Sequence, residues 1–206
     1  MIAIINYGMG NIGSLQNMVQ KVGGTGSIVS TPDELSDASK IILPGVGHFD
    51  NAVKKLKQLG LWSILDEKAR EGIVPILCIC LGAQLVTEGS EEGAKPGFGW
   101  VKGRTVRFSF PDNSKLRIPH MGWNEVQFSK QSRLFSNSST APSFYFVHSY
   151  YMVADDPADV LTTTYYGLEF ASGIERQNIF ALQFHPEKSH KHGMNVIRNF
   201  VEMGQC

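Results

Sequence analysis

The chain has 206 residues, 42% of them hydrophobic, which is enough to bury a substantial core. Its 19 Lys and Arg balance 19 Asp and Glu, and a formal net charge of +0 argues against a protein held on nucleic acid by bulk electrostatics. The first residues lack the basic segment of a signal peptide, and no apolar run approaches the roughly 20 residues that a membrane span needs. Three cysteines, Cys78, Cys80 and Cys206, make no disulfide framework, so we expect a reducing compartment, the cytoplasm.

The first half of the chain predicts strands that alternate with helices. Short apolar runs predict strands at residues 2–5, 27–30, 41–43 and 74–79. Helical spacing or helix-start residues predict helices at residues 11–22, from 31–34 onward, at 49–70 with a break at Gly60, and at 81–88. This βαβ series predicts an α/β protein with a mostly parallel central sheet and helices on both faces.

After Gly97 the pattern changes to strands joined by short turns, which predicts a β-rich extension in the second half. These strands are expected at residues 101–110, 125–128, 143–147, 160–165, 168–174 and 179–184, and a closing helix at 189–203. The sequence has no internal repeat, low-complexity tract or clear linker, so we expect residues 1–206 to form a single domain.

Cys80 stands at the most informative position of the chain. It follows a buried strand and precedes Leu81-Gly82, the pattern of a tight turn that opens a helix and holds a nucleophile out of the backbone. The position two residues earlier is Cys78 where the elbow pattern has glycine, so we expect some crowding there. A buried, inert thiol is the alternative for both cysteines, and it fits Cys78 better because only Cys80 has the downstream glycine.

A second strand ends in His185, followed by Glu187 two residues later, where an extended chain would return the carboxylate to the side of the imidazole. Thiol, imidazole and carboxylate are the parts of an activated nucleophile, and parallel strands would bring their carboxyl ends to one rim. A capped turn and a metal site with His190 and His192 are the alternatives. The spacing matches no standard zinc pattern, and we expect these two histidines at the exposed start of the last helix.

Residues 8–13 fit G-x-G-x-x-G directly after a strand, the context of a dinucleotide site. The second strand, however, ends in Ser30-Thr31 and offers no acidic residue for a ribose. The glycines are therefore interpreted as serving a tight turn.

Several motifs together resemble the class I glutamine amidotransferases of the triad type. They are Cys-Leu-Gly-x-Gln at 80–84, Phe-His-Pro-Glu at 184–187 and Leu-Pro-Gly-Val-Gly at 43–47, with further similar segments at 6–11, 90–93, 119–124 and 146–150. The match is closest to the glutaminase subunits of imidazole glycerol phosphate synthase, from histidine biosynthesis. The resemblance spans nearly the whole chain and implies a flavodoxin-like sheet, no metal and no cofactor.

The resemblance also implies a role for each matching residue. Cys80 would attack the amide carbon of glutamine, with His185 moving the proton and Glu187 orienting His185. The remaining implied residues fall into three groups: the oxyanion hole with Val46 and Leu81, the glutamine site with Gly47, Gln84, Ser149 and Tyr150, and the partner interface with Asn11, Pro119, Met121 and Trp123. Ammonia would pass to a synthase (cyclase) subunit held as a heterodimer.

Three departures from the family pattern bear on that partner. They are Cys78 in place of glycine, Ala83 in place of methionine, and residues 187–193, which look more like relatives that feed ammonia to sugar-modifying enzymes. A paralogue serving surface polysaccharide synthesis is therefore one alternative, and a stand-alone cysteine hydrolase is another. Met121 and Trp123 could also be core residues of the β-rich extension, whereas a bulky aromatic among turn residues favours a docking anchor.

Overall fold

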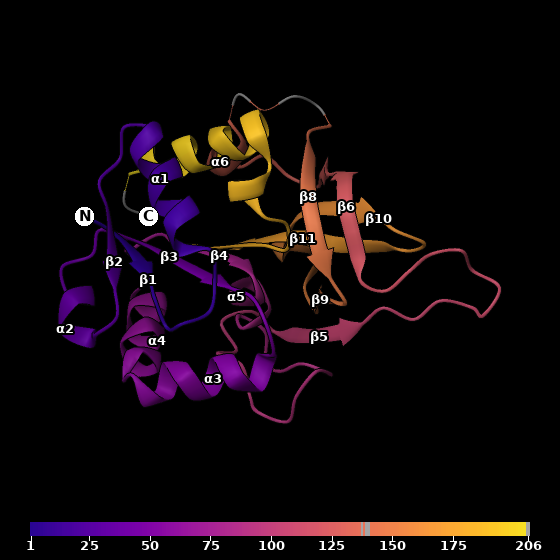
Figure 1. Ribbon diagram of the computed structural model, residues 1–206, viewed down its shortest axis with the longest axis horizontal. Helices are drawn as coiled ribbons and strands as arrows, with labels where there is room; N and C mark the ends of the chain where they lie inside the picture. Colours follow the sequence, from indigo (N-terminus) through magenta and orange to yellow (C-terminus); the bar gives the residue numbers. More distant parts are fainter. Residues whose placement is uncertain (137, 139–140, 205–206) are drawn as a thin grey trace.

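The computed structural model describes residues 1–136, 138 and 141–204, and a 10-stranded sheet runs through its centre (Figure 1). Five neighbouring strands are parallel, in the order β2-β1-β3-β4-β12. Their bounds are Gly26–Val29, Ile2–Ile5, Lys40–Gly45, Ile76–Cys80 and Ile179–Leu182. The predicted mostly parallel sheet is therefore present, and it brings the carboxyl ends of β4 and β12 side by side.

Helices cover both faces of the parallel strands, as predicted (Figure 1). On one face lie α1 (Ile12–Lys21) and α6 (His190–Glu202), which pack against each other. On the other lie α2 (Pro32–Leu35), α3 (Phe49–Gln58) and α4 (Leu61–Glu71). The predicted helix start at residues 31–34 is confirmed, with Thr31 as the N-cap of α2, and so is the break at Gly60. None of the helices in the described part of the chain is long and apolar enough to cross a membrane.

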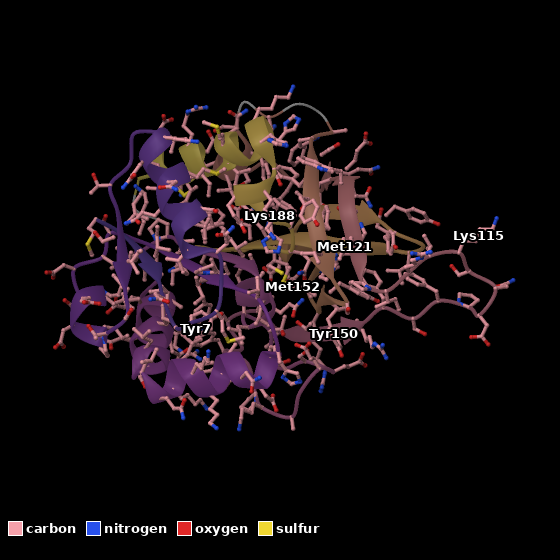
Figure 2. The ribbon with its side chains drawn as sticks, in the orientation of Figure 1. Tyr7, Lys115, Met121, Tyr150, Met152 and Lys188 are labelled. Carbon is pink, nitrogen blue, oxygen red and sulfur yellow. The ribbon has the colours of Figure 1, made fainter. Side chains whose placement is uncertain are left out.

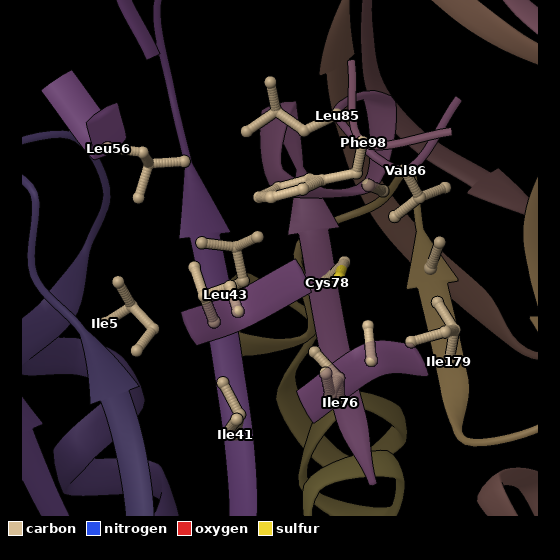
Figure 3. Packing of buried hydrophobic residues seen from close by; sticks show 14 of the residues in the cluster. Ile5, Ile41, Leu43, Leu56, Ile76, Cys78, Leu85, Val86, Phe98 and Ile179 are labelled. Carbon is tan, nitrogen blue, oxygen red and sulfur yellow. The ribbon is translucent and has the colours of Figure 1, made fainter. Parts of the chain in front are cut away.

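Alternation along the strands divides the core into two clusters, one under each helix layer. Ile5, Ile76 and Cys78 pack toward α3 and α4 (Figure 3), whereas Ile4 and Leu77 pack toward α1 and α6. Cys206 lies outside the described residues.

The second half extends the sheet with antiparallel strands, and this also agrees with the prediction. The continuing order is β11 (Glu169–Arg176), β10 (Val160–Tyr165) and β7 (Gln127–Phe128). β9 (Tyr150–Ala154) pairs with β11 and with β5 (Gly103–Arg107). β9 is missing from the sequence prediction. Single 3-10 turns occupy Arg133–Phe135, Pro157–Asp159 and Pro186–Lys188.

A separate two-stranded ribbon, β6 (His120–Glu125) with β8 (Ser143–His148), stands at the rim of the parallel strands (Figure 1). A bridge between Tyr145 and His185 ties this ribbon to the end of β12. The prediction placed Pro119–Asn124 in a turn, and this is wrong because residues 120–125 pair along their whole length with β8.

The predicted helix at 81–88 is also wrong in its length, since α5 is the single turn Leu81–Gln84. The carbonyls of Leu85 and Val86 accept hydrogen bonds from Phe98 and Val101, so they are not available to continue the helix. Smaller differences occur at strand ends: β4 starts at Ile76 rather than 74, and β12 ends at Leu182 rather than 184.

Candidate active site

Cys80 occupies a strained corner between β4 and α5. Its backbone angles are φ 54° and ψ −110°, in a region that residues with a Cβ rarely adopt. Gly82 allows the close crossing of strand and helix, because a Cβ there would overlap the carbonyl oxygen of Leu43. The predicted strand–turn–helix corner is therefore present, and strain at this position is typical of a nucleophile elbow.

Cys78 does not take part in this corner. Its side chain is fully buried in the core cluster beside Leu43 and Ala181 (Figure 3), and burial raises the pKa of its thiol. The expected crowding at the elbow is therefore not seen, and Cys78 matches its alternative interpretation as a core residue.

His185 and Glu187 form a buried pair directly after β12. The imidazole Nδ1 and the carboxylate Oε1 lie 2.8 Å apart, and each side chain is only 2% exposed. The pairing is made by the 3-10 turn Pro186–Lys188, not by the extended chain that the sequence predicted. Ser189 secures this turn by donating to the carbonyl of His185 at 2.6 Å.

Charges around His185 decide its protonation. Burial lowers the pKa of the imidazole, but the charge and hydrogen bonding of Cys80 and Glu187 outweigh burial and raise the pKa to about 10. Nε2 makes no hydrogen bond of standard geometry within the described residues, which leaves it free for the thiol and for substrate. An imidazolium at neutral pH beside Cys80 is the arrangement that stabilises a thiolate nucleophile.

A pocket of about 310 Å³ opens onto Cys80 and His185. The residues implied for the oxyanion hole and the glutamine site all line it, namely Val46, Leu81, Gly47, Gln84, Ser149 and Tyr150. A larger hollow of about 810 Å³ is lined by residues between Phe128 and Ser136 and by Ser138, and it contains none of the predicted site residues.

Gln84 connects two sides of this pocket. Its Nε2 donates to the carbonyl of Tyr150 at 3.1 Å and to Oε1 of Gln183 at 3.2 Å. Gln183 in turn donates from Nε2 toward Cys80 Sγ at 3.8 Å. The sequence prediction did not include Gln183; its position two residues before His185, on the strand that ends at the site, was the available signal.

Glu92 and His148 are two further lining residues that the prediction did not include. One oxygen of the Glu92 carboxylate accepts from the backbone N–H of Phe49 at 2.8 Å, which fixes this negative group at the pocket wall. The motif around residues 90–93 was noted in the sequence, but no feature of it indicated a role for the carboxylate.

Of the four residues implied for the partner interface, only Pro119 lines the pocket. Asn11 is exposed at the start of α1. Met121 and Trp123, on β6, are 62% and 49% exposed, so the alternative that they are core residues is wrong. The Trp123 ring stacks on His190 with centroids 5.2 Å apart.

The other motifs noted in the sequence are the glycines near residue 10 and the histidines near residue 190, and the structure shows where each of them lies. Gly8 and Gly10 adopt positive φ in the turn between β1 and α1, as interpreted from the sequence. His190 is exposed at the start of α6 as expected, whereas His192 is half-buried against Phe144, which corrects the prediction for it. Within the described residues, no cluster of three or more His, Cys, Asp or Glu side chains is arranged to hold a metal ion.

Comparison with known proteins agrees with this geometry. A family model described as glutamine amidotransferase class-I matches residues 3–203. Imidazole glycerol phosphate synthase subunit HisH 2 of Methanococcus maripaludis is 48% identical, with 98% of this chain and 99% of that protein covered. The subunit HisH 2 of Pseudomonas aeruginosa is 44% identical over 98% of this chain and 100% of that protein.

Solved structures resemble the chain at lower identity. A crystal structure of a glutamine amidotransferase gives a TM-score of 0.76 at 16% identity and covers 98% of both chains. The structure of PurLQS from Thermotoga maritima gives 0.72 at 19% identity, covering 97% of this chain and 96% of that one. At such identities the two structures show the fold alone, and it is the α/β fold predicted from the sequence.

Proposed function

Because the chain belongs to the class I glutamine amidotransferases and, within them, to the HisH subunits of imidazole glycerol phosphate synthase, we propose that Cys80, His185 and Glu187 hydrolyse glutamine and that the ammonia passes to the cyclase subunit of that synthase. The protein is then the glutaminase subunit that serves histidine biosynthesis. The observation that carries this proposal is the buried His185–Glu187 pair beside the strained Cys80, at the mouth of one pocket.

In the first half-reaction the Cys80 thiolate attacks the amide carbon of glutamine and forms a tetrahedral intermediate. The backbone N–H groups of Val46 and Leu81 stabilise its oxyanion. His185, protonated and held by Glu187, gives its proton to the leaving nitrogen as the C–N bond breaks. Ammonia leaves, and the acyl group remains on Cys80 as a thioester.

In the second half-reaction His185, now neutral, takes a proton from water. The resulting hydroxide attacks the thioester carbon, and a second tetrahedral intermediate forms against the same N–H groups. Breaking the C–S bond releases glutamate and restores the thiolate. The cycle consumes one glutamine and one water, and it needs no cofactor.

The pocket wall supplies recognition of the rest of the glutamine molecule. Gly47, Gln84 and the Ser149–Tyr150 backbone line the pocket with His185. The fixed carboxylate of Glu92 suits the α-ammonium group of the substrate, since opposite charges attract strongly in a confined site.

We place the docking of the cyclase subunit on Asn11, Pro119, Met121 and Trp123, of which Pro119 lines the pocket. Two large apolar side chains exposed on one strand beside an active site are typical of an interface anchor. Ammonia then crosses from the pocket to the partner without passing through open solvent. We place the complex in the cytoplasm and treat residues 1–206 as one catalytic domain.

The test uses the purified chain, the cyclase subunit and glutamine, with glutamate release as the measurement. Cys80→Ala is expected to abolish release, because no other thiol faces the pocket within the described residues. Cys78→Ala is the matched control and is expected to stay within a few-fold of the parent chain. Labelling with an electrophilic glutamine analogue should modify Cys80; modification of Cys78 with Cys80 intact would disprove the assignment.

One observation favours a second ammonia acceptor, a sugar-modifying enzyme. The segment 187–193, which departs from the histidine-pathway pattern, contributes His190 to the stack with Trp123 at the proposed docking surface. A paralogue that feeds ammonia to a sugar-modifying enzyme would differ at this place. Glutamate release stimulated by such an enzyme but not by the cyclase subunit would identify this paralogue.

A further inference from the structure

Two buried histidines outside the triad lie directly opposite each other on the ribbon, His120 on β6 and His148 on β8. His120 Nδ1 and His148 Nε2 lie 3.0 Å apart, and His148 Nδ1 lies 2.7 Å from the carbonyl oxygen of Tyr150. At the other end, Asn124 Nδ2 lies 3.2 Å from His120 Nε2. These contacts form one line of hydrogen bonds, which runs from Asn124 through His120 and His148 to the Tyr150 carbonyl at the pocket wall.

The groups at the two ends of this line, the Tyr150 carbonyl and the Asn124 amide, decide which atom donates and which accepts in every hydrogen bond between them. The Tyr150 carbonyl can only accept, so His148 Nδ1 carries the hydrogen and its Nε2 accepts from His120 Nδ1. His120 Nε2 then accepts from the Asn124 amide. That amide cannot be turned around, because its Oδ1 accepts from the Glu125 N–H at 2.8 Å and its Nδ2 also donates to the Tyr165 carbonyl at 3.0 Å.

Burial keeps both rings neutral, as this direction requires. It lowers the pKa of His120 to about 4 and that of His148 to about 3. Besides each other, the ionisable group that acts on the pair is His185, which faces His148. The surrounding rings are those of Phe108, Phe146, Tyr166 and Phe170, and the Tyr166 hydroxyl is occupied by the carbonyl of Arg117.

The line ends on the Tyr150 carbonyl, which also takes part in the hydrogen bonds that lead to Cys80. The same Tyr150 carbonyl accepts from Gln84, whose Nε2 also bonds Gln183, and Gln183 donates toward Cys80 Sγ. Met121 and Tyr150, labelled in Figure 2, lie on β6 and at the start of β9. Along β6, His120 and Asn124 face inward while Met121 and Trp123 face outward, so one strand presents both the line and the docking residues.

We propose that His120 and His148 are positioning residues that hold the Tyr150 carbonyl and, through it, Gln84 in the conformation that binds glutamine, with Asn124 setting the direction of the hydrogen bonds. This inference rests on the proposed role of the pocket in binding glutamine. It assigns to the inner face of β6 a function that none of the triad residues performs, and it connects the outer, docking face of that strand to substrate affinity.

Asn124 allows a sharp test, because it lies outside the pocket. Asn124→Ala removes the donor to His120, and KM for glutamine should rise roughly 3- to 10-fold with kcat less affected, the effect of one lost hydrogen bond. Asn124→Asp keeps the shape but places an acceptor opposite His120 Nε2, so it reverses the line and should raise KM more than Asn124→Ala does. Because the aspartate also loses the bond to the Tyr165 carbonyl, a purely structural role would make the rise in KM follow the loss of melting temperature in both variants and stay the same at every pH.

Proton uptake provides a second readout of Asn124→Asp. As the pH falls from about 8 to about 5.5, a proton bound by the new carboxylate–His120 pair restores a donor toward His148, so the KM defect should shrink. The parent chain and the control Gln127→Glu, an amide-to-acid exchange on the neighbouring strand β7 without contact to the line, should show no such change. The measurement is glutamate release by the complex with the cyclase subunit, with each variant's melting curve alongside.

Three results would overturn the inference: equal KM for the two Asn124 variants, a loss confined to kcat, or a defect independent of pH. If Asn124→Asp does not fold, His148→Asn and His148→Ala give the same test. The asparagine amide keeps a donor near the place of Nδ1, so KM should be lower in His148→Asn, and equal values would contradict the proposal. Glutamate release by the parent complex separates these outcomes from a failure of the proposed function itself.

Discussion

The parallel strands and the β6–β8 ribbon serve the same pocket in different ways. The parallel strands place Cys80 and His185 at neighbouring strand ends, inside a core where both side chains are almost completely buried. The ribbon forms its own sheet, is bridged to the end of β12, and exposes Met121 and Trp123. The reacting groups are thus held by the buried parallel strands, whereas the proposed docking residues are carried by a separate strand pair.

The largest loss of activity should come from replacing the triad residues that follow the parallel strands. His185→Ala removes the proton donor and base and should reduce glutamate release about 10⁴-fold. Glu187→Gln should cost less, because the imidazole remains and only its orientation and charge stabilisation weaken. Since Glu187 helps raise the pKa of His185 toward 10, its removal should also shift the alkaline limit of activity to lower pH.

A pH profile of kcat/KM for the parent chain and Glu187→Gln measures both effects, with glutamine-analogue labelling of Cys80 as the control for folding. Near-normal turnover by His185→Ala, or an alkaline limit that moves upward in Glu187→Gln, would contradict the triad.

The next prediction concerns the close contact between β3 and α5 at the corner that carries Cys80. Gly82→Ala places a Cβ against the Leu43 carbonyl, which is backbone and cannot move aside, so unfolding free energy should fall by about 3 kcal/mol or more. Gly13→Ala, in α1 with open space around it, is the matched control and should be neutral or stabilising by about 0.5 to 1 kcal/mol. Denaturant titration of both variants decides; equal stabilities would show that the crossing at Gly82 is not tight.

A smaller effect is expected for the β6–β8 ribbon, where the measured quantity is affinity for the cyclase subunit. Trp123→Ala should weaken association with the cyclase subunit by about 2 kcal/mol, roughly 30-fold, while the isolated variant keeps its melting temperature because the ring is half exposed. Ile73→Ala, equally exposed but before the amino-terminal end of β4, opposite the end that carries Cys80, should leave affinity unchanged. Unchanged affinity with a lowered melting temperature would make Trp123 a structural residue instead.

The same two regions also differ in how far the sequence predicts them. Three of the parallel strands, β1, β4 and β12, are short, fully apolar runs, and β1 and the triad motifs were identified from that local pattern. β6 contains Gly122 and Asn124 and follows Pro119, residues of a turn, and its pairing with β8 depends on a distant segment. β9 follows β8 after only Ser149, so no local signal separates the two strands. Gln183 and Glu92 gain their roles through contacts across the fold, which spacing alone does not encode.

The smallest effect concerns the end of β3, which leads to Val46 in the pocket lining. The buried hydroxyl of Tyr7 donates to the Pro44 carbonyl at 2.9 Å, two residues before Val46. Burial, followed by the charge of the Cys80 thiolate, raises the pKa of Tyr7, so the hydroxyl remains a donor. We expect the isolated chain to be a poor glutaminase, because the glycine-flanked peptide at Val46 can take either orientation until the partner docks, and this bond would hold it in the unproductive one. Removing it should let the Val46 N–H reach the productive orientation more often in the isolated chain.

Tyr7→Phe is therefore expected to lower the unfolding free energy by about 1 kcal/mol, and to reduce the ratio of glutaminase activity in the complex to that of the isolated chain by roughly 2- to 5-fold. Tyr165→Phe, which removes an exposed hydroxyl without a hydrogen-bond partner in the described residues, is the matched control. Activities of the isolated chain and of the saturated complex give the ratio directly. A ratio that stays the same in Tyr7→Phe despite the lower stability would mean that the parallel strands hold the oxyanion segment without this bond, and that partner activation acts through the ribbon alone.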